Sequence, residues 1–89
     1  MTVTSEIDLA ALRWIRTATR DGSARTIREE ARITIPELAE RIGVSAAAVS
    51  RWERGNRVPS GAAARRYAAA LLELQTAVGG EGVTSLPAA

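Results

Sequence analysis

Residues 34–59 read T-I-P-E-L-A-E-R-I-G-V-S-A-A-A-V-S-R-W-E-R-G-N-R-V-P, a stretch that predicts two short helices joined by a tight turn. Thr34 followed three residues later by Glu37 is a capping box, which covers the free backbone N–H groups at a helix start. Gly43 tolerates the left-handed geometry that ends a helix, and Ser45 suits the cap of the next one. Two short helices with a glycine in the turn indicate a helix-turn-helix, whose second helix can enter the major groove of DNA.

Apolar residues at helical spacing indicate which side of each helix faces the core. In the second helix, Val49 and Trp52 point inward, and Gly55 marks the end. The outward positions then combine alanines, which can pack on thymine methyls, with a serine and arginines, which can bond to bases or phosphates. An ordinary helical hairpin with a solvated arginine face has the same spacing, so the spacing alone does not separate the two. These outward positions are Ala46, Ala47, Ser50, Arg51 and Arg54.

The pattern T-x-x-E-L-A-x-x-x-G-V-S-x-x-x-V-S-x-W-E-x-G-x-x-x-P resembles the helix-turn-helix of the Cro/XRE family of phage repressors and bacterial regulators. The resemblance covers Arg25 to about Leu74 and is most specific in S-R-W-E-R-G-N-R-V-P. It implies an all-α fold, a lambda-repressor-like compact bundle of about five helices. It also implies that Arg28 and Glu53 pair as structural residues. The DNA contacts it implies are Thr34, Ser45, Ala46, Ala47, Ser50 and Arg51, with Arg54, Asn56 and Arg57 at the loop that follows.

The chain departs from the family pattern at two places. Ile35 stands where many relatives have a glutamine, which removes a common contact with phosphate or base. Alanines occupy positions 46–48, where relatives often carry polar residues. Recognition of the DNA sequence should therefore depend on Ser50 and Arg51, on contacts of the alanine methyl groups with thymine methyls, and on DNA shape.

Composition limits the other functions that the chain could have. Eighty-nine residues make one small domain, and there is no cysteine or histidine. A disulfide framework and a thiolate metal site are excluded, so we expect no metal and no cofactor. No run of 18 apolar residues exists and the N-terminus lacks a signal pattern, so we expect a cytoplasmic protein without a membrane partner.

The charge is more informative in its distribution than in its total of +2. Residues 1–22 are neutral overall, whereas residues 23–74 carry nine arginines against six acids. A cluster of arginines opposed by Glu53 alone is the electrostatic footprint of a DNA binder, although a solvated charge run is the alternative. The cluster consists of Arg51, Arg54, Arg57, Arg65 and Arg66.

We expect three segments along the chain. Residues 1–22 form an accessory helix from about Ser5, which either packs in the core or dimerises, because Leu9 and Leu12 lie off its main apolar stripe. Residues 23–78 form the helix-turn-helix domain, with further helices at 23–33 and from 61 to about 77. Residues 79–89, which begin G-G-E-G, read as a flexible C-terminal tail. The stripe of the accessory helix consists of Ile7, Ala11, Trp14, Ile15 and Ala18.

The leading hypothesis is a sequence-specific double-stranded DNA-binding transcriptional regulator, a repressor of the phage, prophage or autoregulatory type. It would insert the helix Ser45–Arg54 into the major groove, as a homodimer on a palindromic operator. The alternative is a protein-interaction module, such as an antitoxin that binds a partner through its apolar helix surfaces. We do not expect an enzyme, because capping and a solvated face explain Glu37 and Glu40, and G-G-E-G lacks the G-K-[ST] of a phosphate loop.

Overall fold

The computed structural model describes the backbone of residues 2–88 and the side chains of residues 9–77. This part of the chain contains five α-helices and no strand, which confirms the all-α prediction. In chain order the helices are α1 (Thr2–Asp21), α2 (Ser23–Glu30), α3 (Ile35–Ile42), α4 (Ala46–Glu53) and α5 (Gly61–Ala88).

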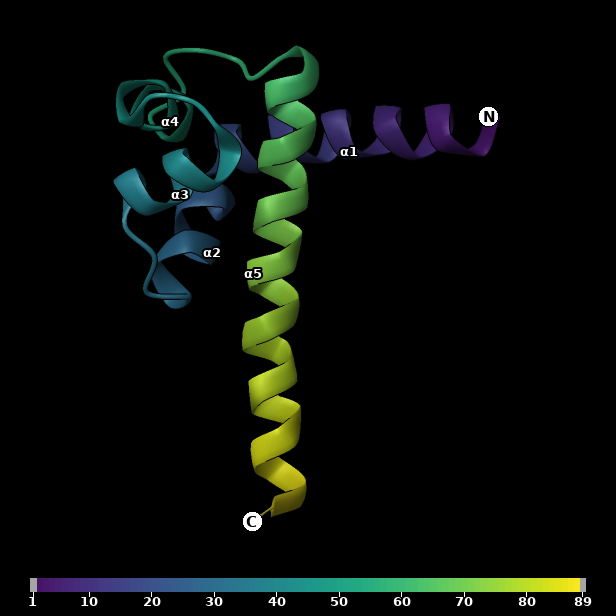
Figure 1. Cartoon of the computed structure of the whole chain (residues 1–89), viewed down its shortest axis with the longest axis vertical. Coiled ribbons are helices and arrows are strands. Elements are labelled where there is room, and N and C mark those ends of the chain that lie inside the picture. The colour runs from purple at the N-terminus through teal and green to yellow at the C-terminus, as the bar shows by residue number, and fades with distance from the viewer. Residues whose placement is uncertain (1, 89) are drawn as a thin grey trace.

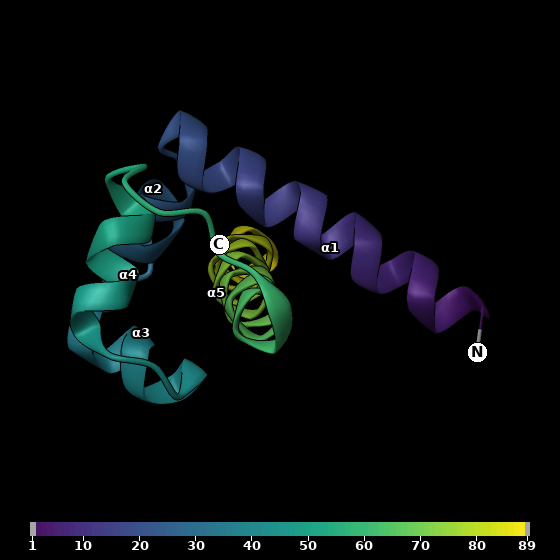
Figure 2. The ribbon, with the colours of Figure 1, turned by 90° about the horizontal axis from the view of Figure 1, so that it is seen from above.

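The long helix α5 is the axis of the molecule. The three short helices α2, α3 and α4 gather on one side of α5, and α1 crosses α5 near the end where α5 begins (Figure 1). Seen along α5, the three short helices lie on one side of it and α1 passes along another side (Figure 2). Helix α5 contacts α1, α2 and α3, so it links the accessory helix to the helix-turn-helix formed by α3 and α4.

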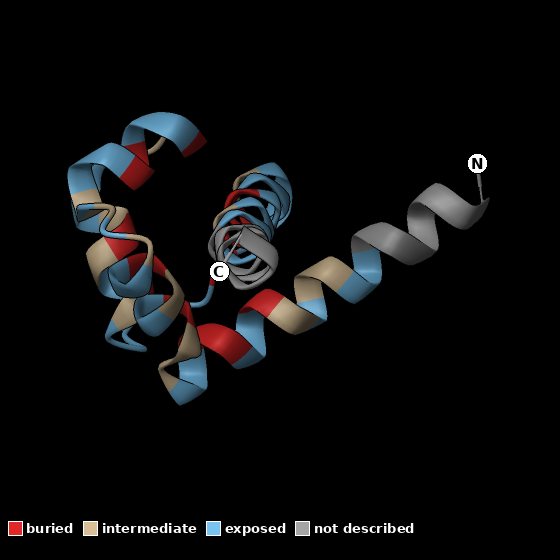
Figure 3. Cartoon of the chain, turned by 90° about the horizontal axis from the view of Figure 1, so that it is seen from below, coloured by how far each residue is buried: buried red, intermediate tan, exposed pale blue. Residues whose placement is uncertain are grey.

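The core lies where these helices face one another, as the distribution of buried residues shows (Figure 3). Tyr67 of α5 is fully buried and stacks on Trp52 of α4, with ring centroids 4.8 Å apart and an angle of 27° between the rings. Aliphatic side chains from all five helices complete the core. The largest of them are Ile15, Leu38, Ile42, Val49 and Leu71.

Helix α1 joins this core with its C-terminal half. Ile15 and Ala18 are buried, and Trp14 packs against the cluster from a half-buried position. Leu9, in contrast, is 67% exposed, and α1 runs away from the other helices toward its N-terminus (Figure 2). The described half of α1 therefore packs in the core, one of the two roles expected for it, whereas the side chain of Ile7 lies outside the described residues.

Helix α2 ends at Glu30, three residues before the predicted end at Ile33. Arg32 adopts a left-handed backbone with φ of 60°, which breaks the helical path. Its N–H donates to Glu29 O at 3.0 Å, and the N–H of Ile33 donates to Arg28 O at 3.1 Å. This pair of bonds is a Schellman motif, whose left-handed position is usually occupied by glycine. Here Arg32 occupies it, so no glycine in the sequence indicates that the helix ends at this point.

The other two ends also differ from the predictions. Helix α1 begins at Thr2 rather than near Ser5. Helix α5 continues to Ala88 instead of ending near Ala77, and it crosses the residues expected as a flexible tail. Glycine disfavours a helix by only about 1 kcal/mol per residue, so the glycines at 79, 80 and 82 do not forbid it. Among the described residues, no helix has the length and apolar character needed to cross a membrane.

Candidate nucleic-acid interface

Helix α3 begins with the capping box that its sequence predicts. The hydroxyl of Thr34 accepts a bond from the backbone N–H of Glu37 at 3.2 Å. In return, the carboxylate of Glu37 accepts from the backbone N–H of Thr34 at 2.9 Å. The hydroxyl of Thr34 also donates to this carboxylate, at 3.0 Å. The backbone and hydroxyl bonds from Thr34 favour the charged carboxylate and lower the pKa of Glu37 below its ordinary value. The start of α3 is thus fixed by its own side chains.

The turn between α3 and α4 is equally well defined. Gly43 has a φ of 85°, and its N–H donates to Ala39 O at 2.8 Å. The N–H of Val44 donates to the same carbonyl at 3.0 Å. The hydroxyl of Ser45 then accepts from the N–H of Ala48 at 3.1 Å, which caps α4. The direction in which α4 leaves the turn is therefore set by local hydrogen bonds.

The exposed face of α4 is small and basic. Ala46 and Ala47 are exposed in the first turn, Ser50 is half-buried, and Arg51 is exposed one residue further on. Arg54 follows at the C-cap, where its Nε donates to Ser50 O at 3.4 Å. This face is the outward surface that the sequence predicts for the second helix, and its first turn allows a close approach of another molecule.

The loop after α4 keeps two more candidate residues beside this face. Gly55 has a φ of 75°, and the N–H of Asn56 donates to Arg51 O at 2.9 Å, so the chain folds back on the end of α4. Asn56 and Arg57 are exposed. Arg51 and Arg57 line a common hollow of about 290 Å³, which also reaches Ser60 before α5. The fold thus brings together arginines from the helix and from the loop, whereas Thr34 lies on the other helix with its hydroxyl engaged in the cap.

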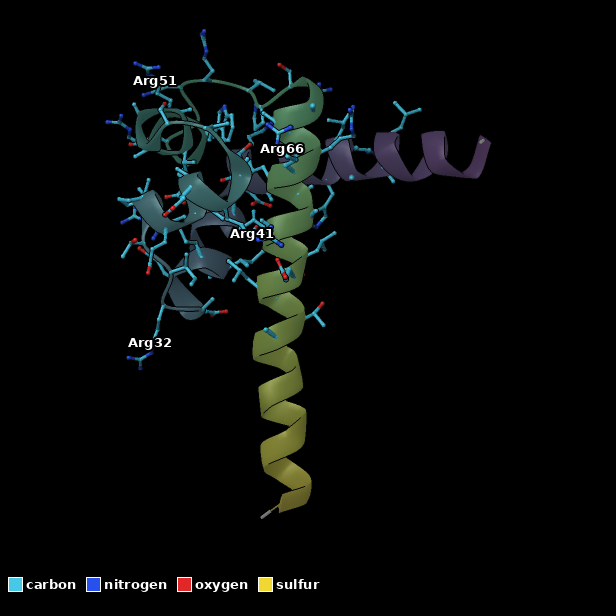
Figure 4. The ribbon with its side chains drawn as sticks, in the orientation of Figure 1. Arg32, Arg41, Arg51 and Arg66 are labelled. Carbon is cyan, nitrogen blue, oxygen red and sulfur yellow. The ribbon has the colours of Figure 1, made fainter. Side chains whose placement is uncertain are left out.

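Not all of the arginine cluster lies on this face. Arg66 points from α5 toward the end of α3, where its Nε donates to Ile42 O at 2.7 Å. Arg41 pairs with Glu73 at 3.1 Å on the same side. In Figure 4, Arg41 and Arg66 lie beside α5, and Arg51 points outward from α4. The prediction that all five arginines form one cluster is therefore wrong for Arg66. Its position on α5 directs its side chain toward the end of α3 and not toward the loop after α4.

A buried ion pair joins α2 to the end of α4. The guanidinium of Arg28 and the carboxylate of Glu53 are 10% and 4% exposed, and one of their two hydrogen bonds, from Nη2 to Oε1, is 3.0 Å long. Arg28 also donates to Ile33 O at 2.8 Å, and hydrogen bonding to Glu53 raises the pKa of Arg28. Loss of one partner from a buried pair leaves an uncompensated charge and typically costs about 3–5 kcal/mol. The pair holds the end of α4 against α2.

Sequence reasoning missed one connection to this region. Arg16 of α1 donates from Nε to the backbone carbonyl of the buried Pro59 at 3.4 Å, so the accessory helix is tied to the loop after α4. Nothing in the local pattern around Arg16 signals a partner so distant in the chain. Within the described side chains, no group of three or more acidic, histidine or cysteine residues could hold a metal ion.

Two helices at this spacing, with a capped second helix that presents an exposed basic face, define a helix-turn-helix protein of the DNA-binding class. Comparison with protein families supports the same class: a family model described as helix-turn-helix matches residues 25–71, more than half of the chain. The chain belongs to this Cro/C1-type helix-turn-helix family, the XRE family of DNA-binding regulators. No curated protein and no solved structure was found to match the chain.

Proposed function

We propose that this protein is a transcriptional regulator that reads a specific double-stranded DNA sequence with α4. The observation that carries the proposal is the exposed face of α4, where two alanines open the helix and Arg51 follows one turn later beside Arg57 of the loop. A face that is small at its start lets the helix approach base edges closely, and the arginines supply bonds to guanine and to phosphate.

The residues of this face have separate roles in the proposal. The methyl groups of Ala46 and Ala47 pack on thymine methyls, and Arg51 bonds to the edge of guanine. Ser50 is half-buried and reaches the groove with its hydroxyl alone. The remaining residues contact the phosphates on both sides of the groove and position the helix. These are Thr34, Ser45, Arg54, Asn56 and Arg57.

A single unit of this size contacts few base pairs, so the regulator acts as a homodimer on a palindromic operator. The two half-sites lie about one helical turn, ~34 Å, apart. Repression follows when the bound dimer occupies a promoter and blocks the polymerase. This mode of action suits a phage or prophage repressor or an autoregulatory protein.

The test is selection of bound sequences from a random DNA pool, repeated at two salt concentrations. We expect a palindromic site and a steep loss of affinity with salt, because each neutralised phosphate releases counterions. The Arg51→Ala variant should lose roughly 1–3 kcal/mol on the selected site and much less on unrelated DNA. Measured affinities of both DNAs by fluorescence anisotropy check this expectation.

Arg41→Ala is the matched control for that experiment. It removes the same charge from an exposed arginine that pairs with Glu73 on the side of α5, away from Arg51 (Figure 4). It should leave the affinity for the selected site nearly unchanged. Equal weakening of specific and unrelated DNA by Arg51→Ala would show a phosphate contact instead of base reading. Selection without any enriched site would contradict the proposed function itself.

A second candidate function is the binding of a partner protein, as an antitoxin does. The observation that favours it is the exposure of two leucines, Leu9 on α1 (67%) and Leu72 on α5 (43%). Such a protein would show no salt-dependent DNA binding, and a Leu72→Ser variant would lose the partner while keeping its fold.

A further inference from the structure

Helix α1 lies outside the residues that the family model matches, yet its C-terminal end is held beside the loop that follows α4. Ile15 and Ala18 bury the inner face of this end. On its outer side, Arg16 donates to Pro59 O. The end of α1 and the α4–α5 loop therefore form one continuous surface, which the residues matched by the family model do not provide on their own.

That surface contains a basic hollow of about 300 Å³. Arginines enter it from two elements: Arg16 and Arg20 come from α1, and Arg57 comes from the loop. The remaining lining residues, Thr19, Gly55 and Val58, carry no charge. Three arginines that line one hollow give it a positive charge, which favours the binding of an anion there.

No acidic side chain of the described part of α1 opposes these arginines before its last residue. From Leu9 to Arg20 the helix contains three arginines and no acid. The carboxylate of Asp21, at the end of α1, accepts hydrogen bonds from the backbone N–H (2.9 Å) and the hydroxyl of Ser23. Hydrogen bonds from Ser23, and to a smaller degree the charge of Arg20, lower the pKa of Asp21. Asp21 is thus the one acid of the described part of α1 near Arg20, and its carboxylate is also bonded at the start of α2.

We propose that Arg16 and Arg20 of α1, together with Arg57, form a phosphate-binding site that extends the DNA interface beyond the helix-turn-helix. The site rests on the proposed function, because the anion is a phosphate of the same DNA whose major groove receives α4. Asn56 and Arg57 lie in the loop after α4, three and four residues beyond its end at Glu53, so the strand that flanks the groove passes the loop and then reaches the end of α1. Arginine suits this role because its planar guanidinium bonds to two phosphate oxygens at once.

The geometry also predicts where the contact ends. Arg13 lies one turn before Arg16 on α1 and does not line the basic hollow. It lines a neighbouring hollow that Arg16 and Arg20 also reach, with Leu9, Leu12 and Thr17, and no residue of the loop lines that hollow. Because α1 runs away from the helix-turn-helix toward its N-terminus (Figure 2), and Arg13 shares no hollow with Arg57 among those described, we expect Arg13 not to reach the phosphate. The effect of substitution should therefore be large at Arg20 and absent at Arg13.

The experiment compares the full-length parent, Arg20→Ala and Arg13→Ala on the selected operator fragment over a range of salt. Arg20 is chosen because Arg16 also holds the loop. Arg20→Ala should reduce the slope of log affinity against log salt by about 0.9, and reduce affinity roughly eight-fold at about 0.1 M salt, the effect of one phosphate contact on B-DNA. Arg13→Ala, with the same change in net charge, should match the parent in both quantities.

A second measurement locates the phosphate. Replacing single phosphates beside the site by neutral methylphosphonates should reveal one position where the parent loses affinity and Arg20→Ala loses nothing further. If Arg20→Ala and Arg13→Ala have equal effects, or if no phosphate position behaves in this way, the proposed site is overturned while the parent still binds its operator. A parent that binds no DNA would overturn both the site and the proposed function.

Discussion

At the scale of single residues, Tyr67 combines a tightly packed ring with a buried hydroxyl that has no hydrogen-bond partner in the described part of the molecule. Its ring stacks on Trp52 and is fully buried. Burial, with a further effect from the charge of Glu53, raises the pKa of Tyr67, so the hydroxyl stays protonated. A buried polar group without a partner costs free energy that an apolar group of the same shape would not.

Tyr67→Phe should therefore stabilise the protein. We expect the free energy of unfolding to increase by about 1 kcal/mol, because the ring and its stacking remain and the desolvated hydroxyl is removed. Urea unfolding of the two proteins measures the difference. A decrease in stability would contradict the expectation and would show that the hydroxyl has a bonding partner in solution.

Residue-scale features divide into those that the sequence predicts and those that it does not. The burial of Val49 and Trp52 follows from helical spacing within a few residues. The bond from Arg66 to Ile42 O depends on how α5 packs against α3, which no local pattern reveals. The same is true of Arg16 and Pro59, because their contact exists only when α1 is docked.

At the scale of elements, helix ends were predictable where the sequence carries a specific capping residue. The starts of α3 and α4 and the turn between them follow from Thr34, Gly43 and Ser45. The end of α2 was not predictable, because Arg32 takes the left-handed position that glycine usually occupies. The continuation of α5 past Ala77 was missed because the glycines beyond it weaken helix propensity without preventing a helix.

The capping box of α3 also predicts a dependence of stability on pH. Hydrogen bonds from Thr34 lower the pKa of Glu37 in the folded protein. A depressed pKa contributes stability that is present above the unfolded value, about 4.3, and is lost as the pH falls through the folded value. Glu37→Gln keeps the shape of the cap and removes the charge.

We therefore expect the parent to melt at a higher temperature than Glu37→Gln at pH 7, and expect this advantage to shrink below about pH 4.3. Asp21 also has a lowered pKa, because Ser23 hydrogen bonds to it, but both proteins carry Asp21 and its effect cancels. Thermal unfolding followed by circular dichroism between pH 7 and pH 3 measures the difference. If the difference in melting temperature between the parent and Glu37→Gln is the same from pH 7 to pH 3, the charge of Glu37 is not the cause of that difference.

At the scale of the whole molecule, α1 is part of the core near its C-terminal end and is exposed at Leu9. Ile15 is fully buried between α1 and the rest of the core, whereas Leu9, less than two turns earlier, is 67% exposed. Stability should therefore depend on the second half of α1. The exposed side chain of Leu9 remains available to a second copy or a partner.

Two alanine substitutions separate these roles. Ile15→Ala should reduce the free energy of unfolding by about 2–5 kcal/mol, because it opens a cavity in a packed core. Leu9→Ala should change it by no more than about 0.5 kcal/mol, because the side chain is exposed. Urea unfolding at low protein concentration measures both, and a large loss for Leu9→Ala would place that leucine in an interface that stabilises the protein.

Two long-range bonds from arginines to backbone carbonyls have a consequence for protein engineering. Residues 34–59 read as a self-contained cassette, but the carbonyl of Ile42 is satisfied by Arg66 of α5 and that of Pro59 by Arg16 of α1. A designer who grafts this cassette onto another scaffold, to transfer its DNA specificity, must supply a donor for each carbonyl or accept a looser turn and loop. The portable unit is therefore larger than the motif, and it includes the two helices that provide these guanidinium groups.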